Sequence, residues 1–451
     1  MTRYLVNPLV LFLAVWSTAV ALYLGGVYAG TFPSPQSALW AAVLLNVGGF
    51  TLGYLTWAAF QRLTPAARLA PSHARVLSPE RITRMLQVAG LMGLFALSLA
   101  VYRTGVIASH LGMSLPQLLT DPGMLRVGFA MFVTAGVFET SWIVMLNSVT
   151  SSLFSLGFVL LGVFLHVEVG RRKYVYLAGF LLITLATGLT SVSRYEATVN
   201  IVYMVFAYCV VSSTRQRQDR RPACSDADRR FSQCPHGHTT NGLRLPMPPV
   251  ARGHRVLAVL LPLAATATLF FVIDLLLRKS AEYGRPDRLQ GFVYHLFWYL
   301  ASPLAAFNEF LATFDGRYHL GQYMFFPFYK WLSRFHLAPE ADISVFGEFV
   351  LIPYAANVYT YLRNFYEDFG MIGVVAAPYA LGLAVSALRT RAAAYFPYLN
   401  LYLVLLVFIL FSFYNFFLFS NQVYLQILFG FLLFRYELPD AMRRSCAWTE
   451  V

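Results

Sequence analysis

The feature of this sequence that most limits its fold is a succession of long apolar stretches. A membrane-spanning helix needs about 20 mostly apolar residues, and suitable stretches lie at roughly 8–29, 38–60, 86–106, 174–192, 194–212, 255–277, 368–388, 397–415 and 421–436. Another apolar stretch, 127–169, is long enough for one crossing or two. Only 12% of the 451 residues are charged, against about 25% in a soluble domain. The sequence therefore predicts an all-α polytopic membrane protein.

The basic residues predict the topology, because loops that stay in the cytoplasm are rich in Lys and Arg. Segment 61–85 has five Arg and one Glu, and segment 213–255 has nine Arg and three Asp. If both are cytoplasmic, the stretch 127–169 crosses an odd number of times. We expect one crossing, near 147–169, and thus about ten transmembrane helices with both termini in the cytoplasm.

We expect three parts in the chain: N-terminal membrane helices in 1–277, an outer loop in 278–366, and C-terminal membrane helices with a cytoplasmic tail in 367–451. A second loop, 213–255, lies within the first part on the cytoplasmic side. The cytoplasmic loop 213–255 has five prolines among scattered charges, which is typical of a flexible segment. Its Cys and His residues, at 224 and 234–238, lack the usual spacing of zinc ligands, so we expect no metal site.

The outer loop is unusually aromatic for a loop. It carries eight basic and seven acidic residues, and its part between 292 and 335 contains sixteen Phe, Tyr and Trp. This density is too apolar for a solvated loop, so we expect short helices that lie on or dip into the outer interface. The aromatic rings would anchor the loop on the bilayer, and they would also offer flat faces to sugars beside a lipid tail.

The first candidate site is the turn Thr187-Gly-Leu-Thr-Ser-Val-Ser-Arg194-Tyr-Glu196 between two spans. If the second helix begins near residue 190, Ser191, Arg194 and Thr198 share one face. An arginine on the outer side runs against the positive-inside bias, which favours a functional role for Arg194. The alternative is an interfacial Arg194 that extends toward water or pairs with Glu196.

The second candidate site precedes the span 368–388. At helical spacing, one face would collect four polar residues: Asn357, Thr360, Asn364 and Glu367. Arg363 can reach Glu367 four residues later. Gly370 and Gly373 would let a neighbouring helix approach closely. The alternative is a helix start with ordinary interfacial polar residues.

The third candidate site is the set of charges in the outer loop: Arg278, Lys279, Arg285, Arg288, Asp315, Arg317, His319, Glu340, Asp342 and Glu348. Paired arginine forks suit a diphosphate, and His319 or a carboxylate can serve as a general base. Each residue has the alternative of being an exposed loop charge. The sequence has no P-loop, no dinucleotide-binding glycine motif and no H-E-x-x-H zinc motif. An activated lipid-linked substrate, which needs neither nucleotide nor metal, fits that restriction.

These pieces resemble the Wzy-type O-antigen polymerases, the oligosaccharide repeat-unit polymerases of bacterial envelopes. The resemblance rests on the Thr187-Gly-x-x-Ser-x-Ser-Arg194 turn, on Tyr299-Leu-Ala-Ser-Pro303-Leu-Ala-Ala-Phe307, and on the segment from Asn357-x-x-Thr360 to Asp368-Phe-Gly-x-x-Gly373. It covers roughly residues 86–436. The family's Gly-Ser-Arg turn is Ser-Val-Ser-Arg here, which keeps the arginine.

The resemblance implies a GT-C-like, metal-independent glycosyltransferase of the bacterial inner membrane. It would transfer a glycan from undecaprenyl diphosphate to a sugar hydroxyl of the next lipid-linked repeat unit on the periplasmic face. The expected partners are the undecaprenyl-diphosphate-linked oligosaccharide, membrane lipid, a flippase and a chain-length regulator. No cofactor and no nucleic acid is expected.

That reaction suggests roles for the candidate residues. The departing diphosphate gathers negative charge, which arginine can stabilise; the candidates are Arg194, Arg285, Arg288, Arg317 and Arg363. A general base would take the acceptor proton; the candidates are His319, Glu348, Glu367 and Asp368. Substrate contacts would come from Asn357, Thr360 and Asn364. The sequence does not choose one base.

Two other functions stay open. An O-antigen ligase or a similar transferase would share the topology, the donor and the arginine chemistry, and would differ only in its acceptor. A lipid-linked glycan transporter or flippase would place charged or broken-helix sites near the middle of the membrane. Most polar residues here are predicted at the outer ends of spans, with Glu139 as the exception, so we favour an enzyme.

Overall fold

The computed structural model describes residues 7–63, 75–120, 142–168, 170–190, 194–218, 288–338, 350–352, 355–356, 358–392, 394–414 and 420–438, and single residues 124, 128 and 343. Its helices are α2 (Pro8–Tyr28), α3 (Ser37–Leu63), α4 (Pro79–His110), α5 (Leu115–Thr120), α7 (Trp142–Val167), α8 (Arg172–Thr190), α9 (Arg194–Gln218), α11 (Arg288–Thr313), α12 (Phe326–Arg334), α13 (Leu362–Arg391), α14 (Phe396–Phe411) and α15 (Asn421–Leu433). Its strands have two residues each: β1 (Arg75–Val76), β2 (Val350–Leu351), β3 (Ala355–Ala356) and β4 (Tyr436–Glu437).

Within the described residues, seven helices are long and apolar enough to cross a membrane, namely α2, α3, α4, α7, α8, α9 and α13. Each coincides with a predicted span. Helices α14 and α15 also match predicted spans, but they have only 16 and 13 residues and are shorter than expected. The predicted span 255–277 and the segment 129–141 lie outside the described residues. The described chain therefore has the architecture of an all-α polytopic membrane protein.

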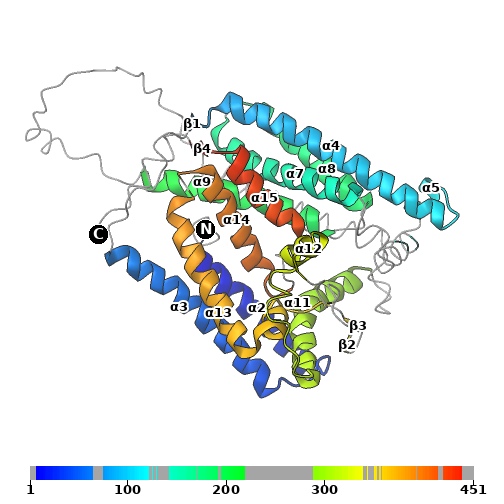
Figure 1. Cartoon of the computed structure of the whole chain (residues 1–451), viewed down its shortest axis with the longest axis vertical. Helices are drawn as coiled ribbons and strands as arrows, with labels where there is room; N and C mark the ends of the chain where they lie inside the picture. Colours follow the sequence, from blue (N-terminus) through cyan, green and yellow to red (C-terminus); the bar gives the residue numbers. More distant parts are fainter. Residues whose placement is uncertain are drawn as a thin grey trace, which may run out of the picture.

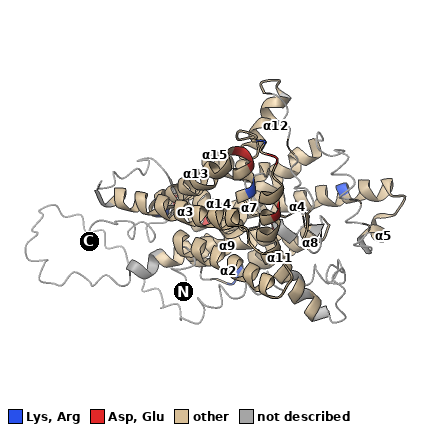
Figure 2. Ribbon diagram, turned by 90° about the horizontal axis from the view of Figure 1, so that it is seen from below, with Lys and Arg blue, Asp and Glu red and all other residues tan. Residues whose placement is uncertain are grey.

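The helices form two groups that meet along α14 and α15 (Figure 1). One group contains α2, α3, α11 and α13, and the other contains α4, α7, α8 and α9. Helix α14 contacts members of both groups, and α15 packs against α7 and α14. Charged residues are sparse along the helical body (Figure 2), as expected for a surface that faces lipid.

The tightest helix pair is α3 against α13, and glycines make it possible. A Cβ atom at Gly53 would overlap the carbonyl oxygen of Tyr379, and one at Gly49 would lie 2.7 Å from the carbonyl oxygen of Val375. From the other side, a Cβ atom at Gly382 would overlap the carbonyl oxygen of Phe50. Gly49 and Gly53 stand four residues apart, the small-residue spacing that lets membrane helices approach closely.

Short strands tie several connections together at one end of the helical body. Strand β1 pairs in parallel with β4, Tyr395 forms a bridge with Glu437, and the Leu438 N–H donates to the carbonyl oxygen of Ala394. The starts of α4 and α14 and the ends of α13 and α15 therefore meet there, and we call it the strand end. At the opposite end, the Tyr361 N–H before α13 donates to the carbonyl oxygen of Ser412 after α14. We call this the loop end.

Helix α11 corrects the expectation of only short interfacial helices in 278–366. It has 26 residues, and its middle part from Ala301 to Asn308 is buried. Phe297 and Trp298 pack their rings against Phe32. Because every residue from 301 to 308 is buried, this part of the helix is covered all round, which favours burial among other helices over an interface with one wet face. Helix α12, with nine residues, has the expected short length.

The α3–α13 contact predicts the effect of adding one methyl group. Gly53→Ala should lower the thermal midpoint of the detergent-solubilised protein, because overpacking costs about 1–3 kcal/mol. Gly48→Ala is the matched control, since nothing lies within 4 Å of a Cβ atom there, and alanine is the better helix former. Equal midpoints for the two variants, measured by size-exclusion chromatography after heating, would contradict this view of the contact.

Candidate functional site

The site is built around the first turns of α13, which a break separates from the rest of that helix. Gly370 has φ 60° and ψ −148°, a backbone conformation that side-chain-bearing residues rarely adopt. Its missing Cβ atom faces the Tyr318 ring, and a Cβ atom at Gly373 would overlap the carbonyl oxygen of Phe365. The expectation that Gly370 and Gly373 receive a neighbouring helix is therefore wrong. They allow α13 to bend at Gly370, so that residues 362–369 form a short helix with its own direction, packed closely against the longer part.

Tyr361 holds the start of α13 in the helical body. Its hydroxyl donates to Asn46 Oδ1 of α3 at 2.5 Å, and its ring packs on Trp16 of α2 and Phe408 of α14. The Trp16 Nε1–H also donates to Ser412 Oγ, at 3.0 Å. Three helices thus fix the residue that precedes the site, which pre-organises the turn after it.

Arg363 and Glu367 form a buried ion pair one helical turn apart. The Arg363 Nη2 lies 3.0 Å from Glu367 Oε1, as their spacing of four residues predicts. The Arg363 guanidinium carbon lies 4.0 Å from the Tyr359 ring centre and 4.8 Å from the Phe310 ring centre. These aromatic faces stabilise the cation in a place with little water.

Several polar atoms of this turn have no hydrogen-bond partner among the described residues, although they are buried: Thr360 Oγ1, Arg363 Nε, Arg363 Nη1 and Glu367 Oε2. A buried donor or acceptor left unsatisfied costs about 1–3 kcal/mol, so native proteins keep few of them. Their concentration in two turns of chain indicates a place made for a polar ligand. Arg363 offers donors to an anion, and Glu367 Oε2 offers an acceptor to a proton donor.

Asp368 has a structural task. Its Oδ1 accepts the Tyr323 N–H at 3.0 Å, and its Oδ2 accepts the Met324 N–H at 2.7 Å. The backbone adds two more links, because the N–H groups of His319 and Leu320 donate to the carbonyl oxygens of Glu367 and Asp368. Each carboxylate oxygen thus accepts a backbone N–H, so Asp368 acts as a clamp on the loop 319–324. Its role as a general base stays a prediction.

The clamp brings His319 and Tyr323 to the ion pair. The two rings pack edge to face with 5.3 Å between their centres, and the His319 N–H lies 2.9 Å from the Glu367 carbonyl oxygen. Burial raises the pKa of Tyr323, and the Glu367 carboxylate beside its hydroxyl raises it further. Tyr323 therefore stays a hydrogen-bond donor at physiological pH. His319 thus lies beside the Arg363–Glu367 pair, although it comes more than forty residues earlier in the sequence.

Two other predicted residues of these regions lie outside the buried part of this site. Arg317 is exposed and pairs with Asp315, with 3.4 Å between Nε and Oδ2. Asn364 is half-buried on the first turn of α13. The predicted polar stripe from Asn357 to Glu367 is wrong as a helical face, because α13 begins at Leu362 and residues 358–360 are not helical.

The remaining predicted residues are not described in full. Arg194 and Arg288 are the first residues of α9 and α11, and the structure does not describe their side chains. Outside the described residues lie Ser191, Arg278, Lys279, Arg285, Glu340, Asp342, Glu348 and Asn357.

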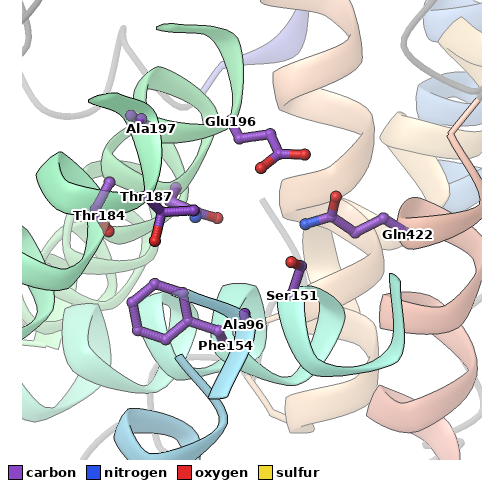
Figure 3. A pocket seen from close by; sticks show the side chains of 10 residues that line it. Ala96, Ser151, Phe154, Thr184, Thr187, Glu196, Ala197 and Gln422 are labelled. Atoms are coloured by element: carbon purple, nitrogen blue, oxygen red, sulfur yellow. The ribbon is translucent and has the colours of Figure 1, made fainter. Parts of the chain in front are cut away.

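A second polar cluster lies in the other helix group and was not predicted as a whole. Six polar residues from α7, α8, α9 and α15 line a small cavity (Figure 3): Ser151, Thr184, Thr187, Glu196, Asn200 and Gln422. Glu196 and Gln422 face each other across it. The Gln422 Nε2 donates to Ser155 Oγ at 3.3 Å, and Ser155 Oγ donates to Asn200 Oδ1 at 2.7 Å. Hydroxyl and amide residues within apolar spans were the signal that could have indicated it.

Glu196 of this cluster interacts with a cation from another helix. Among the described side chains, the cation that acts on Glu196 is Arg103 of α4. Glu196 therefore interacts with a residue other than the neighbouring Arg194 that the sequence suggested.

Among the residues that the structure describes, no group of three His, Cys, Asp or Glu side chains is placed to hold a metal ion. The segment with Cys224 and residues 234–238 lies outside that part of the chain. Comparison with known proteins finds no family model that matches the chain, and no similar curated protein or solved structure. The site is therefore interpreted from its own geometry.

The clamp at Asp368 is testable without an activity assay. Asp368→Asn leaves one acceptor oxygen for two backbone N–H groups, and hydrogen bonds to charged groups contribute about 1.5–3 kcal/mol each. Amide hydrogen exchange in residues 319–325 should become faster, while exchange in α3 and α14 stays slow. Asp315→Asn, which changes an exposed pair, serves as the control. If exchange in 319–325 is the same in both variants, Asp368 does not hold the loop.

Proposed function

We propose that this protein is a membrane glycosyltransferase that polymerises undecaprenyl-diphosphate-linked oligosaccharide repeat units into O-antigen or a related surface polysaccharide. The observation that carries the proposal is the buried Arg363–Glu367 pair, whose remaining donors and acceptor lack partners among the described residues. An anion next to an acceptor hydroxyl would satisfy these atoms. A departing diphosphate and an attacking sugar hydroxyl have that chemistry.

In this mechanism, each residue has one task. The acceptor hydroxyl oxygen bonds to the anomeric carbon of the donor sugar, while the bond from that carbon to the diphosphate oxygen breaks. Arg363 donates hydrogen bonds to the departing diphosphate, and Glu367 Oε2 takes the acceptor proton. His319, beside Glu367, is the other candidate base. Asp368 is a positioning residue, because it holds the loop that carries His319 and Tyr323.

The distribution of charge supports an orientation in which the loop end faces the periplasm. Basic residues gather at the strand end, where Arg81 stacks on Tyr436 at 5.0 Å and where Arg389, Arg391 and Arg435 lie beside the connections. The positive-inside rule places such an end in the cytoplasm. The Arg363–Glu367 site would then lie on the periplasmic side of the bacterial inner membrane, with a GT-C-like arrangement and cytoplasmic termini.

The reaction can be tested directly with purified protein. A polyprenyl-diphosphate-linked repeat unit, without nucleotide sugar, should give a ladder of products spaced by one unit, with release of polyprenyl diphosphate. Arg363→Gln should lower the rate on the order of 100-fold or more, the usual effect of removing one transition-state donor. Arg317→Gln is the matched control, since Arg317 is exposed and should leave the ladder unchanged.

If the Arg363→Gln variant gives no ladder of products, the result can be interpreted only when the variant is folded. Arg363→Gln must elute as a monodisperse peak with a thermal midpoint near that of the parent protein, or Arg363→Lys is used in its place. Full activity in a folded Arg363 variant would contradict the proposal. Transfer of the glycan to another acceptor, without a ladder, would indicate a ligase instead. Movement of the intact lipid across the membrane without any bond change would indicate a flippase.

A second experiment separates the two candidate bases. If Glu367 takes the proton, Glu367→Gln should lose about as much activity as Arg363→Gln, whereas His319→Gln should keep most of it. The readout is the initial rate of polyprenyl diphosphate release. The opposite ranking would assign the proton transfer to His319.

A further inference from the structure

Helix α12 presents its apolar side outward. Phe325, Phe328, Leu332 and Phe335 are spaced by three, four and three residues, which places them on one face of a helix. They are 46%, 43%, 42% and 73% exposed, and Leu337 just beyond them is 73% exposed. Pro327, on the other side, is buried. A helix on a water-facing surface has the opposite arrangement, with its polar side exposed.

This apolar face continues the lipid-facing surface of a membrane helix. The Phe328 ring packs edge to face on Tyr424 of α15, with 5.0 Å between the ring centres. Tyr424, Leu428 and Leu432 follow one another at intervals of four residues along α15, and Leu428 and Leu432 are exposed. Helix α15 is apolar and packs against α7, which is long and apolar enough to cross a membrane. Its exposed apolar stripe therefore indicates the side on which lipid lies.

The same contact gives the depth of α12. Tyr424 is three residues from the start of α15 at Asn421, and a helix rises about 1.5 Å per residue, so Tyr424 lies roughly 5 Å from that end. Figure 2 shows α12 projecting from the helical body near α15. Helix α12 therefore lies beside the bundle at the level where the apolar spans end.

The basic residues of α12 suit such a boundary. Lys330 is half-buried, and its Nζ lies 5.8 Å from the centre of the Phe326 ring. His336 is exposed after the helix. Apolar rings on one side and a lysine on the other are typical of helices that lie in the headgroup layer, where the lysine reaches lipid phosphates.

The loop before α12 is the one that Asp368 clamps. Met324, whose N–H the Asp368 carboxylate accepts, is two residues from the first residue of α12. Only a few residues therefore connect α12 with His319 and the Arg363–Glu367 pair. A change in the depth of α12 would change the depth of that site.

We propose that α12 is an interfacial anchor, which inserts its Phe325–Phe328–Leu332–Phe335 face into the bilayer at the loop end and holds the Arg363–Glu367 site at the depth of the lipid headgroups. The occupant of the face is the lipid bilayer. The inference does not depend on the proposed glycosyl transfer, since it follows from exposure and packing alone.

The test measures depth with nitroxide labels on the full-length protein in vesicles of phosphatidylcholine and phosphatidylglycerol. After replacement of the four native cysteines, single cysteines are introduced as Phe335→Cys, Leu337→Cys and, as the aqueous control, Arg317→Cys. At 335 and 337, oxygen, which is enriched in the bilayer, should relax the label more than a water-soluble nickel chelate does. At 317, the order should reverse. Greater access of the chelate at 335 and 337 would overturn the proposal.

A second copy of the chain on this face would give a different result. Both reagents would then be excluded from position 335, and neighbouring labels would broaden the spectrum until unlabelled protein is added. That outcome would also overturn the bilayer assignment.

The link to the site has its own readout. With the label at Asn364→Cys, replacement of Leu332 and Phe335 by glutamate should increase the access of the nickel chelate at least twofold, whereas Arg317→Glu should not change it. Unchanged access at 364 would show that α12 does not set the depth of the site. Neither experiment uses catalysis, so its failure is separate from a failure of the proposed reaction.

Discussion

The close approach of α3 and α13 is the contact on which the rest of this architecture depends. Glycines on both helices bring backbone against backbone, which gives van der Waals contact where the hydrophobic effect gives no driving force between helices in lipid. This contact sets the axis of α13. Tyr361 then adds directed hydrogen bonds and ring contacts from α2, α3 and α14. The start of α13 is therefore fixed, and the polar turn after it can be held in a defined place.

Burying the polar turn 360–367 costs free energy, and this cost indicates that the turn binds a ligand. Arg363 and Glu367 compensate each other in part, and the Tyr359 and Phe310 rings stabilise the guanidinium. The remaining buried atoms gain nothing from the described residues. Such groups persist where binding requires them, because a pre-formed polar site avoids reorganisation when a charged ligand arrives. The proposed glycosyl transfer places a diphosphate at this turn. The proposed anchor independently places the turn at the depth of the lipid headgroups, which is where the diphosphate of a lipid-linked substrate would lie.

Local patterns were predicted well and the roles of neighbours poorly. The spacing of four residues between Arg363 and Glu367 predicted their ion pair, which is confirmed. Asp368, the next residue, was predicted as a base on chemistry alone, whereas its oxygens hold backbone N–H groups of Tyr323 and Met324. Nothing in the sequence near Asp368 indicates that it contacts a loop more than forty residues earlier. The same limit applies to Gly370, which bends its own helix. Gly49 and Gly53 differ, because their spacing of four residues is itself a sequence signal for close helix packing.

The sequence by itself determined the class of protein and most of its helices, because apolar length and the cost of unsatisfied backbone in lipid leave few alternatives to spanning helices. It also determined contacts between residues a helical turn apart, which need only local geometry. Tertiary structure alone decided that His319 meets Glu367, that Asp368 is a clamp and that α11 is buried in the helical body. These outcomes depend on which helices pack together, and in a chain that is apolar almost throughout, hydropathy is nearly the same for every pairing. Shape and a few polar contacts make that choice, and they exist only once the helices are assembled.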